Sequence, residues 1–472
     1  MPTFFFFCHR FFELRFVVAT GILDNLTKHG TVCLMLPESL AQSFAPLLDN
    51  NKSIRIIHSR YDKIPGWRRF ALNFFGDILY LTFPNTNDCP NATAEFHRQH
   101  YYSKSKFKTY FTIGFSRIAS KFSPLLKMVV FLYQSFLPSI HDDLLNKEKP
   151  DLMIGCSFGL SIEDAAFLYE AKRNGITSAV LVQSWDRTSN KGYPTVHPDH
   201  ALVWNNIMKR EAVINLNFDE NHVRVIGSPL WDTHFKTLER SHDPDWRKNL
   251  GIKDSTKVLF YACGGFGNHP ANMTVIPKVF DLAKEQPFND KIHIVFRLYP
   301  HYLSPVTQSG EGKKKRNEIE KLLAQYQDEE NITILYPDLK FDGKNFVPSA
   351  EDHHFMTECL YQCDISLSQV SSQMIEACIF DKPSINIEFG RRVTDKYDLE
   401  IKDYKTEHLL RIYRTNAIYR VQTKEALIPT IALALKNPKE RQKQRETLVQ
   451  QEAPVYRGQS SEEAAKLLAT LI

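Results

Sequence analysis

The stretch SLSQVSSQMIEACIFDKPSINIEF, residues 366–389, carries the clearest fold signal in the chain. A short apolar run predicts a strand, and the serine-rich turn after it leads into a helix beginning near Ser371. Asp381-Lys382-Pro383 then turns the chain into a second strand, predicted over Ser384–Ile387. Strand, helix and strand in this order form a βαβ unit, which predicts a parallel sheet covered by helices.

The same alternation of short apolar strands and helices runs outward from this stretch. The other predicted strands are 3–8, 31–36, 54–58, 151–155, 177–183, 201–204, 223–226, 257–261, 293–298, 332–336 and 364–367. Helices are predicted between them, among others over 15–28, 162–173 and 207–215. A chain of 472 residues exceeds what one hydrophobic core usually organises. The polar, proline-containing segment 239–246 therefore marks a boundary between two α/β domains, 1–240 and 247–450, and a C-terminal helix follows within 451–472.

The stretch from about 60 to 145 breaks this alternation and is helical by pattern, which predicts a helical insertion in the first domain. From Tyr101 to Ile140 it contains six Lys or Arg residues and no Asp or Glu, and Phe and Tyr are interleaved with the basic residues. Interfacial helices often have this composition, so we expect the stretch to dock on an anionic membrane face. A buried aromatic insertion with solvated lysines is the alternative.

Composition and cysteine spacing limit the kinds of partner and the cellular location that we expect. The net charge of +5 is too small to indicate a nucleic-acid partner, and 43% apolar with 24% charged residues is ordinary for a globular protein. The eight cysteines contain no CxxC pair, which favours a reducing cytoplasm. No apolar run is long enough to span a bilayer, and Phe4–Cys8 is predicted to be a buried strand and not part of a signal peptide. The expected location is cytoplasmic, and peripheral attachment to the inner membrane face is the alternative.

The turn in the quoted stretch is the first candidate site, because ligands of parallel sheets bind at the carboxyl ends of strands. Ser371 and Ser372 place hydroxyl and backbone donors at a helix start, where an anion is stabilised. Glu376 lies one turn further on, where its carboxylate could accept hydrogen bonds from two ribose hydroxyls. The alternative is a serine-capped core helix with a solvated glutamate.

This pattern resembles the donor-site signature of GT-B glycosyltransferases. Their relatives include the non-hydrolysing UDP-GlcNAc 2-epimerases and the CDP-glycerol glycerophosphotransferases, and the resemblance extends along most of the chain. It implies two Rossmann-like domains facing across a cleft, with the nucleotide donor bound by the second domain. It also implies that Ser371 and Ser372 hold the donor diphosphate and that Glu376 holds the ribose.

Two further strand ends of the second domain belong to the predicted donor site. In VLFYACGGFGNHPAN, residues 258–272, a strand runs into Gly264, Gly265 and Gly267, which allow close approach of a phosphate to the backbone; a tight turn is the alternative. In HIVFRLYPHYL, residues 293–303, Arg297 could clamp a diphosphate, and His301 follows in the loop. This strand end is similar to that of the surface-polysaccharide and teichoic-acid branch, with the histidine displaced.

The first domain is expected to present the acceptor. Asp186 follows a predicted strand and is the main candidate for the general base, although an Asx-turn would also explain it. His9 closes the first strand in a loop that contacts the acceptor in many GT-B enzymes, and it is the second catalytic candidate. The segment Gly227-Ser228-Pro229, followed by Asp232, resembles a G-x-P-x-x-D element and is expected to be structural.

Two other patterns have weaker functional interpretations. Residues 155–159, GCSFG, match the GxSxG hydrolase elbow around Ser157, but a second nucleotide-type domain has no place in a simple hydrolase. Cys359 and Cys363, near His353 and His354, lie on a predicted helix at a spacing unlike that of zinc sites. No metal and no cofactor is predicted, because helix dipoles and Arg can neutralise a leaving diphosphate.

Together these patterns predict a glycosyltransferase that moves a sugar from a nucleoside diphosphate sugar to a cell-surface polysaccharide, lipopolysaccharide or lipid-linked acceptor. A CDP-alcohol glycerophosphotransferase and a UDP-sugar 2-epimerase are the enzymatic alternatives. The bulky insertion favours an acceptor and argues against an epimerase. A carbohydrate- or membrane-binding module without activity is the alternative from another class.

Overall fold

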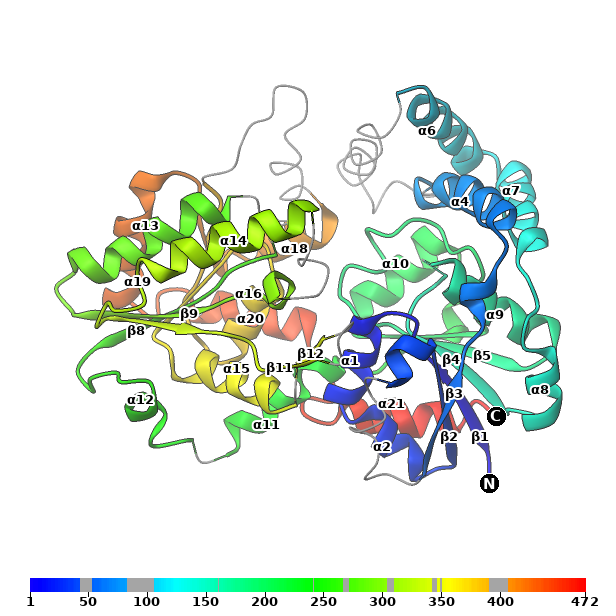
Figure 1. Ribbon diagram of the computed structural model, residues 1–472, viewed down its shortest axis with the longest axis horizontal. Coiled ribbons are helices and arrows are strands. Elements are labelled where there is room, and N and C mark those ends of the chain that lie inside the picture. The colour runs from blue at the N-terminus through cyan, green and yellow to red at the C-terminus, as the bar shows by residue number, and fades with distance from the viewer. Residues whose placement is uncertain are drawn as a thin grey trace. The chain divides into compact units, whose positions relative to one another are not determined.

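The computed structural model describes residues 1–42, 53–82, 106–159, 161–240, 242–265, 271–303, 310–341, 346–348, 350–389 and 406–472. The chain divides into two compact units (Figure 1). Unit 1 comprises Met1–Asp232, Ile401–Leu410 and Ala453–Ile472, and unit 2 comprises Thr233–Glu400 and Arg411–Glu452. The division falls at Asp232, a few residues before the polar segment expected to mark it, and the C-terminal segment belongs to unit 1.

Unit 1 is built on a parallel sheet of seven strands in the order β3-β2-β1-β4-β5-β6-β7. The strands are β1 (Thr3–Phe7), β2 (Thr31–Leu36), β3 (Ile54–His58), β4 (Leu152–Gly155), β5 (Thr177–Leu181), β6 (His200–Val203) and β7 (Val223–Val225). The interior strand β1 pairs with β2 on one side and β4 on the other, and Phe4 to Phe7 are fully buried. The strand order reverses between β1 and β4, which is where open α/β sheets bind ligands.

Helices of unit 1 follow the strands. They are α1 (Phe11–Ala19), α2 (Ile22–Thr27), α9 (Ile162–Arg173), α10 (Asn206–Leu216), α11 (Asp232–Leu238, which continues into unit 2) and α21 (Ser460–Ala469). The single helix expected over 15–28 is wrong, because Gly21 takes a left-handed φ of 67° and separates α1 from α2.

The C-terminal helix α21 is anchored to unit 1 by the segment after β7. Asp232 accepts hydrogen bonds from the backbone N–H groups of Ser460 and Ser461 (2.9 and 2.8 Å) and from the Ser461 hydroxyl (2.6 Å). Gly227 has a φ of 77°, and a Cβ there would lie 2.4 Å from the Ser460 hydroxyl oxygen. These contacts explain both the glycine and the aspartate as structural residues.

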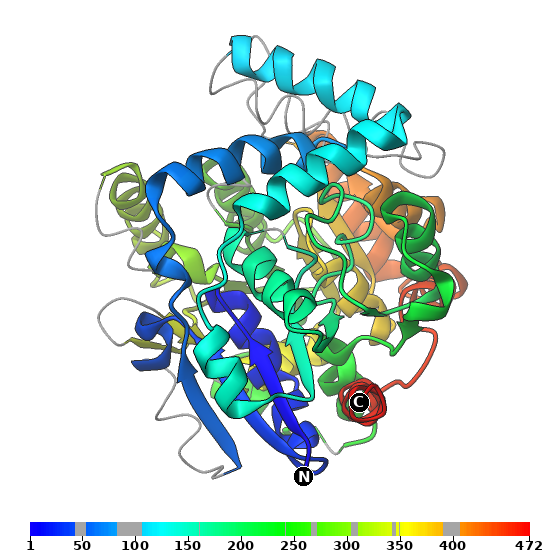
Figure 2. The ribbon, with the colours of Figure 1, turned by 90° about the vertical axis from the view of Figure 1, so that its right-hand side faces the viewer.

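The insertion is helical as expected. It comprises α4 (Gly66–Tyr80), α6 (Lys106–Lys121), α7 (Ser123–Phe136) and α8 (Asp142–Glu148). Stacked rings join the first three of these helices, as in the pairs Phe74–Phe111 and Phe75–Phe136. In Figures 1 and 2, α6 lies farther from the sheet of unit 1 than α4 does.

Unit 2 contains a parallel sheet of six strands in the order β10-β9-β8-β13-β14-β15. The strands are β8 (Lys257–Ala262), β9 (Ile292–Arg297), β10 (Ile332–Leu335), β13 (Ile365–Ser368), β14 (Ser384–Ile387) and β15 (Ile418–Val421), and β11 (Leu339–Phe341) pairs with β12 (Phe346–Pro348) in a separate hairpin. The helices are α12 (Trp246–Asn249), α13 (Asn272–Glu285), α14 (Gly310–Ala324), α15 (Ala350–Gln362), α16 (Gln373–Ile379), α18 (Glu407–Arg414, which begins in unit 1), α19 (Leu427–Lys436) and α20 (Gln442–Glu452).

The predicted fold class of two Rossmann-like domains with a helical insertion in the first is thereby confirmed. β15 and the hairpin were not predicted. Among the described helices, none combines the length and apolar character needed to cross a membrane.

Candidate functional site

The carboxyl end of β13 holds buried polar side chains that lack hydrogen-bond partners within the described part of the chain. Ser368 is fully buried and Gln369 is 1% exposed. The Ser368 hydroxyl and both amide atoms of Gln369 have no hydrogen-bond partner among the residues that the structure describes. Each buried polar group left unpaired costs about 1–3 kcal/mol, so such groups usually mark a place for water or a ligand. The sequence analysis missed Gln369, although its place directly after a predicted strand was a usable signal.

The serine turn that follows is held in a defined shape. The Ser371 hydroxyl accepts a hydrogen bond from the Gln373 backbone N–H (3.0 Å), and the Ser372 carbonyl accepts from Ile375 and Glu376 (2.9 and 3.1 Å). α16 has only seven residues, so its dipole contributes less to anion binding than the expected longer helix would. The turn therefore offers mainly its hydroxyl groups.

Glu376 lies one turn into α16, beside a histidine that the sequence analysis did not identify. Its carboxylate is 3.8 Å from Nε2 of His234 in α11, and the Glu376 side chain is 22% exposed. Burial favours the protonated carboxyl, but the interaction with His234, the Ser372 hydrogen bond and the nearby His353 outweigh it and lower the pKa of Glu376. Glu376 is therefore ionised at neutral pH and can accept hydrogen bonds from hydroxyl groups.

The glycine loop after β8 is only partly described. The Gly264 carbonyl accepts a hydrogen bond from the Asn272 side chain (2.6 Å), and a Cβ on Gly265 would lie 2.9 Å from the Tyr299 ring. Close packing thus explains Gly265 without a ligand. Gly267 lies outside the described residues, and the phosphate-binding role of the loop stays a prediction.

Arg297 ends β9 but is engaged within the protein. Its guanidinium forms an ion pair with Asp352 of α15, and both side chains are buried. Asp352 also accepts a hydrogen bond from the backbone N–H of Asp338 (3.2 Å). This carboxylate neutralises the charge that was expected to clamp a diphosphate, so the structure favours a positioning role for Arg297. His301 lies in a short 3-10 helix, Pro300–Leu303, and its side chain is outside the described part of the chain.

In unit 1, His9 directly follows β1 and lies beside a carboxylate. His9 Nε2 is 3.4 Å from Glu163, and the other oxygen of Glu163 accepts a hydrogen bond from Arg69 of α4 (2.9 Å). The opposite ring nitrogen, Nδ1, is buried and has no hydrogen-bond partner among the described residues. A carboxylate beside one nitrogen of an imidazole orients the ring, which is one feature of a general base.

An ionic network lies next to His9, at the ends of β1 and β4. Arg10 forms ion pairs with Glu13 and with Asp164 (3.1 Å for the latter), and the Ser157 hydroxyl donates to Asp164 (2.6 Å). Burial and the charge of Asp164 raise the pKa of Glu13 to about 7, although Arg10 opposes this. Because Ser157 donates to a carboxylate within this network, the structure favours a structural role over the hydrolase interpretation of GCSFG.

Asp186 is a weaker candidate for the base than expected. Its carboxylate lies 3.1 Å from the Lys191 ammonium and accepts a hydrogen bond from Ser184 (2.6 Å). Burial raises the pKa of Asp186, but Lys191, His408 and Arg187 together outweigh it and hold that pKa far below its usual value. A carboxylate that is so strongly stabilised in its ionised form accepts a proton poorly.

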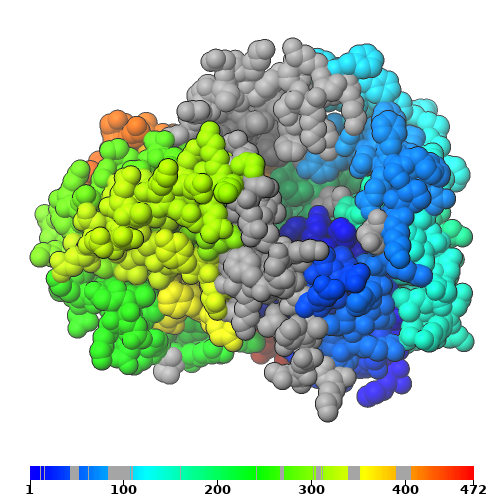
Figure 3. Space-filling model, viewed as in Figure 1, coloured from blue at the N-terminus to red at the C-terminus, as the bar shows by residue number. Residues whose placement is uncertain are grey.

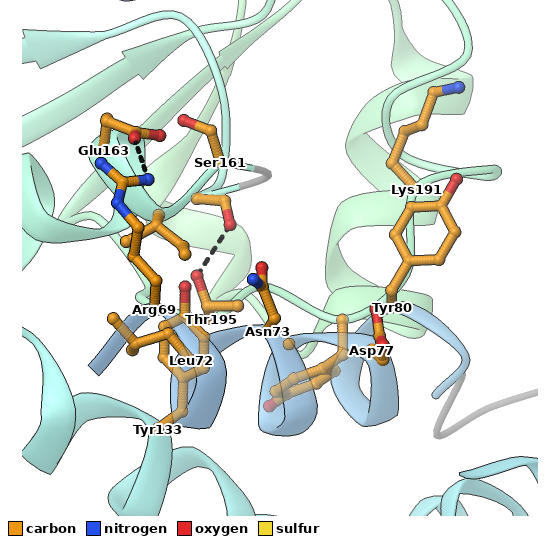
Figure 4. A pocket seen from close by; sticks show the side chains of 14 residues that line it. Arg69, Leu72, Asn73, Asp77, Tyr80, Tyr133, Ser161, Glu163, Lys191 and Thr195 are labelled. Atoms are coloured by element: carbon orange, nitrogen blue, oxygen red, sulfur yellow. Dashed lines mark hydrogen bonds and ion pairs between the residues drawn. The ribbon is translucent and has the colours of Figure 1, made fainter. Parts of the chain in front are cut away.

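A cavity of about 350 Å³ lies within unit 1, between α4 and the loops after β4 and β5. Figure 4 shows Arg69 and Glu163 at one end of this cavity and Lys191 and Tyr80 at the other. Asn73 lines the cavity from α4, between these ends. The walls carry both donors and acceptors, which suits a ligand with several hydroxyl groups.

The cysteine pair with a spacing unlike that of zinc sites is part of the core. Cys359 and Cys363 lie in a hydrophobic core cluster of unit 2. Within the described ranges, no group of three or more His, Cys, Asp or Glu side chains is arranged to hold a metal ion.

Solved structures share this architecture. UDP-GlcNAc 2-epimerase from Neisseria meningitidis bound to UDP-GlcNAc superposes with a TM-score of 0.53 over 100% of both chains, at 14% identity. The GT-B fold is established. UDP-GlcNAc 2-epimerase from Methanocaldococcus jannaschii gives 0.52 over 100% of both chains at 14% identity, and a putative one from Listeria monocytogenes gives 0.53 over 97% of this chain and 93% of the other at 11% identity. No family model and no curated protein matches the sequence.

At these identities the likeness concerns the GT-B fold alone. Only the side chains of each unit indicate what the protein binds. Unit 2 offers buried, unpaired polar groups and an ionised carboxylate at a strand end, and unit 1 offers a polar cavity next to a histidine–carboxylate pair.

Proposed function

We propose that the protein is a glycosyltransferase that takes a sugar from a nucleoside diphosphate sugar. The observation that carries the proposal is the set of buried polar groups at the end of β13, Ser368 and Gln369, followed within one turn of helix by the ionised Glu376. The Neisseria meningitidis epimerase of the same fold is bound to UDP-GlcNAc, which supports a nucleotide sugar as the ligand.

In this proposal unit 2 binds the donor. Gln369 and Ser368 form hydrogen bonds with the nucleotide sugar, and Ser371 and Ser372 donate hydrogen bonds to the diphosphate. Glu376 accepts from the ribose hydroxyls, and His234 keeps its carboxylate ionised and oriented. Charge-assisted bonds of this kind are worth about 1.5–3 kcal/mol each.

Unit 1 binds the acceptor, a glycan or lipid-linked glycan precursor presented at the anionic membrane surface predicted as a partner. The cavity beside α4 holds its hydroxyl groups, and His9 is the base. In the reaction, the acceptor oxygen forms a bond to the anomeric carbon and loses its proton to His9. The bond between that carbon and the phosphate oxygen breaks, and the nucleoside diphosphate leaves. Such transfer would serve polysaccharide biosynthesis.

A UDP-sugar 2-epimerase is the second candidate, because the three neighbours described above carry that activity in their names. It needs no acceptor and inverts C2 of the donor sugar. Incubation of the protein with UDP-GlcNAc alone separates the two functions. Appearance of the C2 epimer supports the epimerase, whereas release of UDP only when a glycan acceptor is added supports the transferase.

Nucleotide binding is the first test. A thermal-shift screen with UDP, CDP, GDP, ADP, TDP and CMP should give stabilisation by at least one diphosphate, of about 2.7 kcal/mol at 100 times its Kd. CDP-glycerol in the same screen tests the glycerophosphotransferase alternative. If no nucleotide at millimolar concentration raises the unfolding temperature, the donor site is refuted. Binding without any turnover would instead support a non-enzymatic module.

A further inference from the structure

The insertion of unit 1 exposes large apolar side chains on three neighbouring helices. The most exposed are Phe107 of α6 (85%), Phe70 of α4 (78%) and Phe131 of α7 (69%), and Trp67 and Ile118 are also exposed. Figure 3 shows the side chains of α4, in blue, and of α6 and α7, in cyan, at the molecular surface. Large apolar side chains exposed on several helices that pack together exceed the scattered single residues of an ordinary surface, and such gatherings normally mark an interaction site.

The exposed residues of α6 form one stripe. Positions 107, 110, 111, 114, 117, 118 and 121 are exposed and recur at the three- and four-residue spacing of a helix face, whereas Thr112, Ile113, Ser116 and Ala119 are buried. The outward stripe thus contains three aromatic residues, one isoleucine and two basic residues. An ordinary surface helix exposes polar residues and buries apolar ones, whereas α6 exposes most of its large apolar side chains.

The charge that α6 and α7 contribute to this surface has a single sign. Arg117, Lys121 and Lys127 are exposed, and residues 106–140 contain no Asp or Glu. Their field is therefore not cancelled within α6 and α7, and each such residue near an anionic leaflet contributes about 1 kcal/mol of attraction.

We infer that the outer faces of α4, α6 and α7 dock the protein on the anionic headgroups of a lipid membrane. Phe, Trp and Ile side chains would enter the boundary between headgroups and acyl chains, and the basic residues would contact lipid phosphates. A second copy fits less well, because a symmetric contact would bring equal basic stripes together. Nucleic acid would use the basic residues but not Ile118 and Met128, which also lie in the exposed stripes.

Helix α4 connects this surface with the cavity of unit 1. α4 turns Trp67 and Phe70 outward, while Arg69 and Asn73 line the cavity. Docking would therefore hold the cavity next to the headgroup layer, where a lipid-linked molecule presents its polar part. The docking inference does not depend on the proposed transfer reaction.

Co-sedimentation of the full chain with vesicles tests the inference. We expect binding to an equal mixture of phosphatidylcholine and phosphatidylglycerol, little binding to phosphatidylcholine alone, and loss of binding at high salt. Lys121→Glu with Lys127→Glu should weaken binding about 30-fold or more, since two attractive contributions are removed. Phe107→Ser with Phe131→Ser should weaken it while leaving the salt dependence in place.

Matched controls come from α19 and the residues just after it in unit 2. Lys436→Glu with Lys439→Glu changes the net charge equally, and Ile428→Ser with Leu433→Ser removes two exposed apolar groups from unit 2. Both control pairs should bind vesicles like the parent protein. The inference is overturned by equal binding to both vesicle types, by no binding at low salt, or by equal effects of test and control pairs. Binding to single-stranded RNA without vesicle binding, or dimerisation abolished by the Phe pair, would also overturn it. Nucleotide binding measured on the same samples separates these outcomes from failure of the proposed function.

Discussion

Replacing Glu376 by Gln tests the donor site directly, because it removes the charge and keeps the size of the side chain. The carboxylate is ionised and lies 3.8 Å from His234, so the protein environment already favours its charged form. A hydrogen bond to a charged acceptor is worth about 1.5–3 kcal/mol and one to a neutral acceptor about 0.5–1.5 kcal/mol. Two ribose hydrogen bonds then lose about 2–3 kcal/mol in total, so Glu376→Gln should raise the Kd about 30- to 150-fold.

Isothermal titration with UDP, or with whichever diphosphate stabilises the protein most, measures this effect. Glu446→Gln is the matched control, because Glu446 is exposed on α20 of the same unit and should leave the Kd unchanged. The unfolding temperature of both variants shows whether unit 2 stays folded. A Kd within about twofold of the parent value in folded Glu376→Gln would remove this residue from the site.

Four further changes test the remaining assignments. His9→Gln should lower the transfer rate about 100-fold or more without changing the Kd of the donor, as steady-state rates and titration would reveal. Asp186→Asn should also spare donor binding and should reduce the rate less than His9→Gln does; a larger reduction would make Asp186 the base. Gln369→Met should raise the unfolding temperature of the unliganded protein, since it removes a buried amide that has no partner among the described residues. The same change should weaken nucleotide binding. A lower unfolding temperature together with unchanged or tighter nucleotide binding would contradict the donor site. The pKa of Glu13 is raised to about 7, so Glu13 should contribute stability to unit 1 below about pH 4.5 and lose that contribution, about 3 kcal/mol at most, as the pH rises through 7. Glu13→Gln should therefore flatten the dependence of unfolding free energy on pH between about pH 5 and 8. An unchanged slope in the variant would refute the raised pKa of Glu13.

The strands were predictable because buried parallel strands are continuous apolar runs bounded by turn residues. Thr31–Leu36, Ile54–His58 and Ser384–Ile387 have the bounds that the pattern predicts. β15 was missed because Arg420 interrupts its short apolar run. The single helix expected over 15–28 is two helices, because the left-handed conformation of Gly21 ends one helix and begins the next, and the sequence pattern does not show that conformation.

For the candidate donor site, too, some features were predictable from the sequence and others were not. Ser371, Ser372 and Glu376 were accessible from the sequence because they lie within six positions of each other, directly after one strand. The partner of Arg297 was not, because Asp352 is 55 residues away and only packing of α15 brings it to the end of β9. Its ion pair decides whether the guanidinium can bind a ligand.

By itself, then, the sequence determined the βαβ alternation, the two Rossmann-like domains, the helical insertion and the strand end at which a ligand should bind. Local periodicity and turn chemistry express these features within a few residues. Only the tertiary structure decided that Arg69, Glu163 and His9 meet, since they come from the insertion, the first turn of α9 and the loop after β1. It also decided that Asp186 is held ionised by Lys191 and that α6 turns its aromatic stripe outward. The physical reason is that charge pairing and burial depend on neighbours brought close by the order of strands in the sheet and by helix packing, and local sequence does not encode that order.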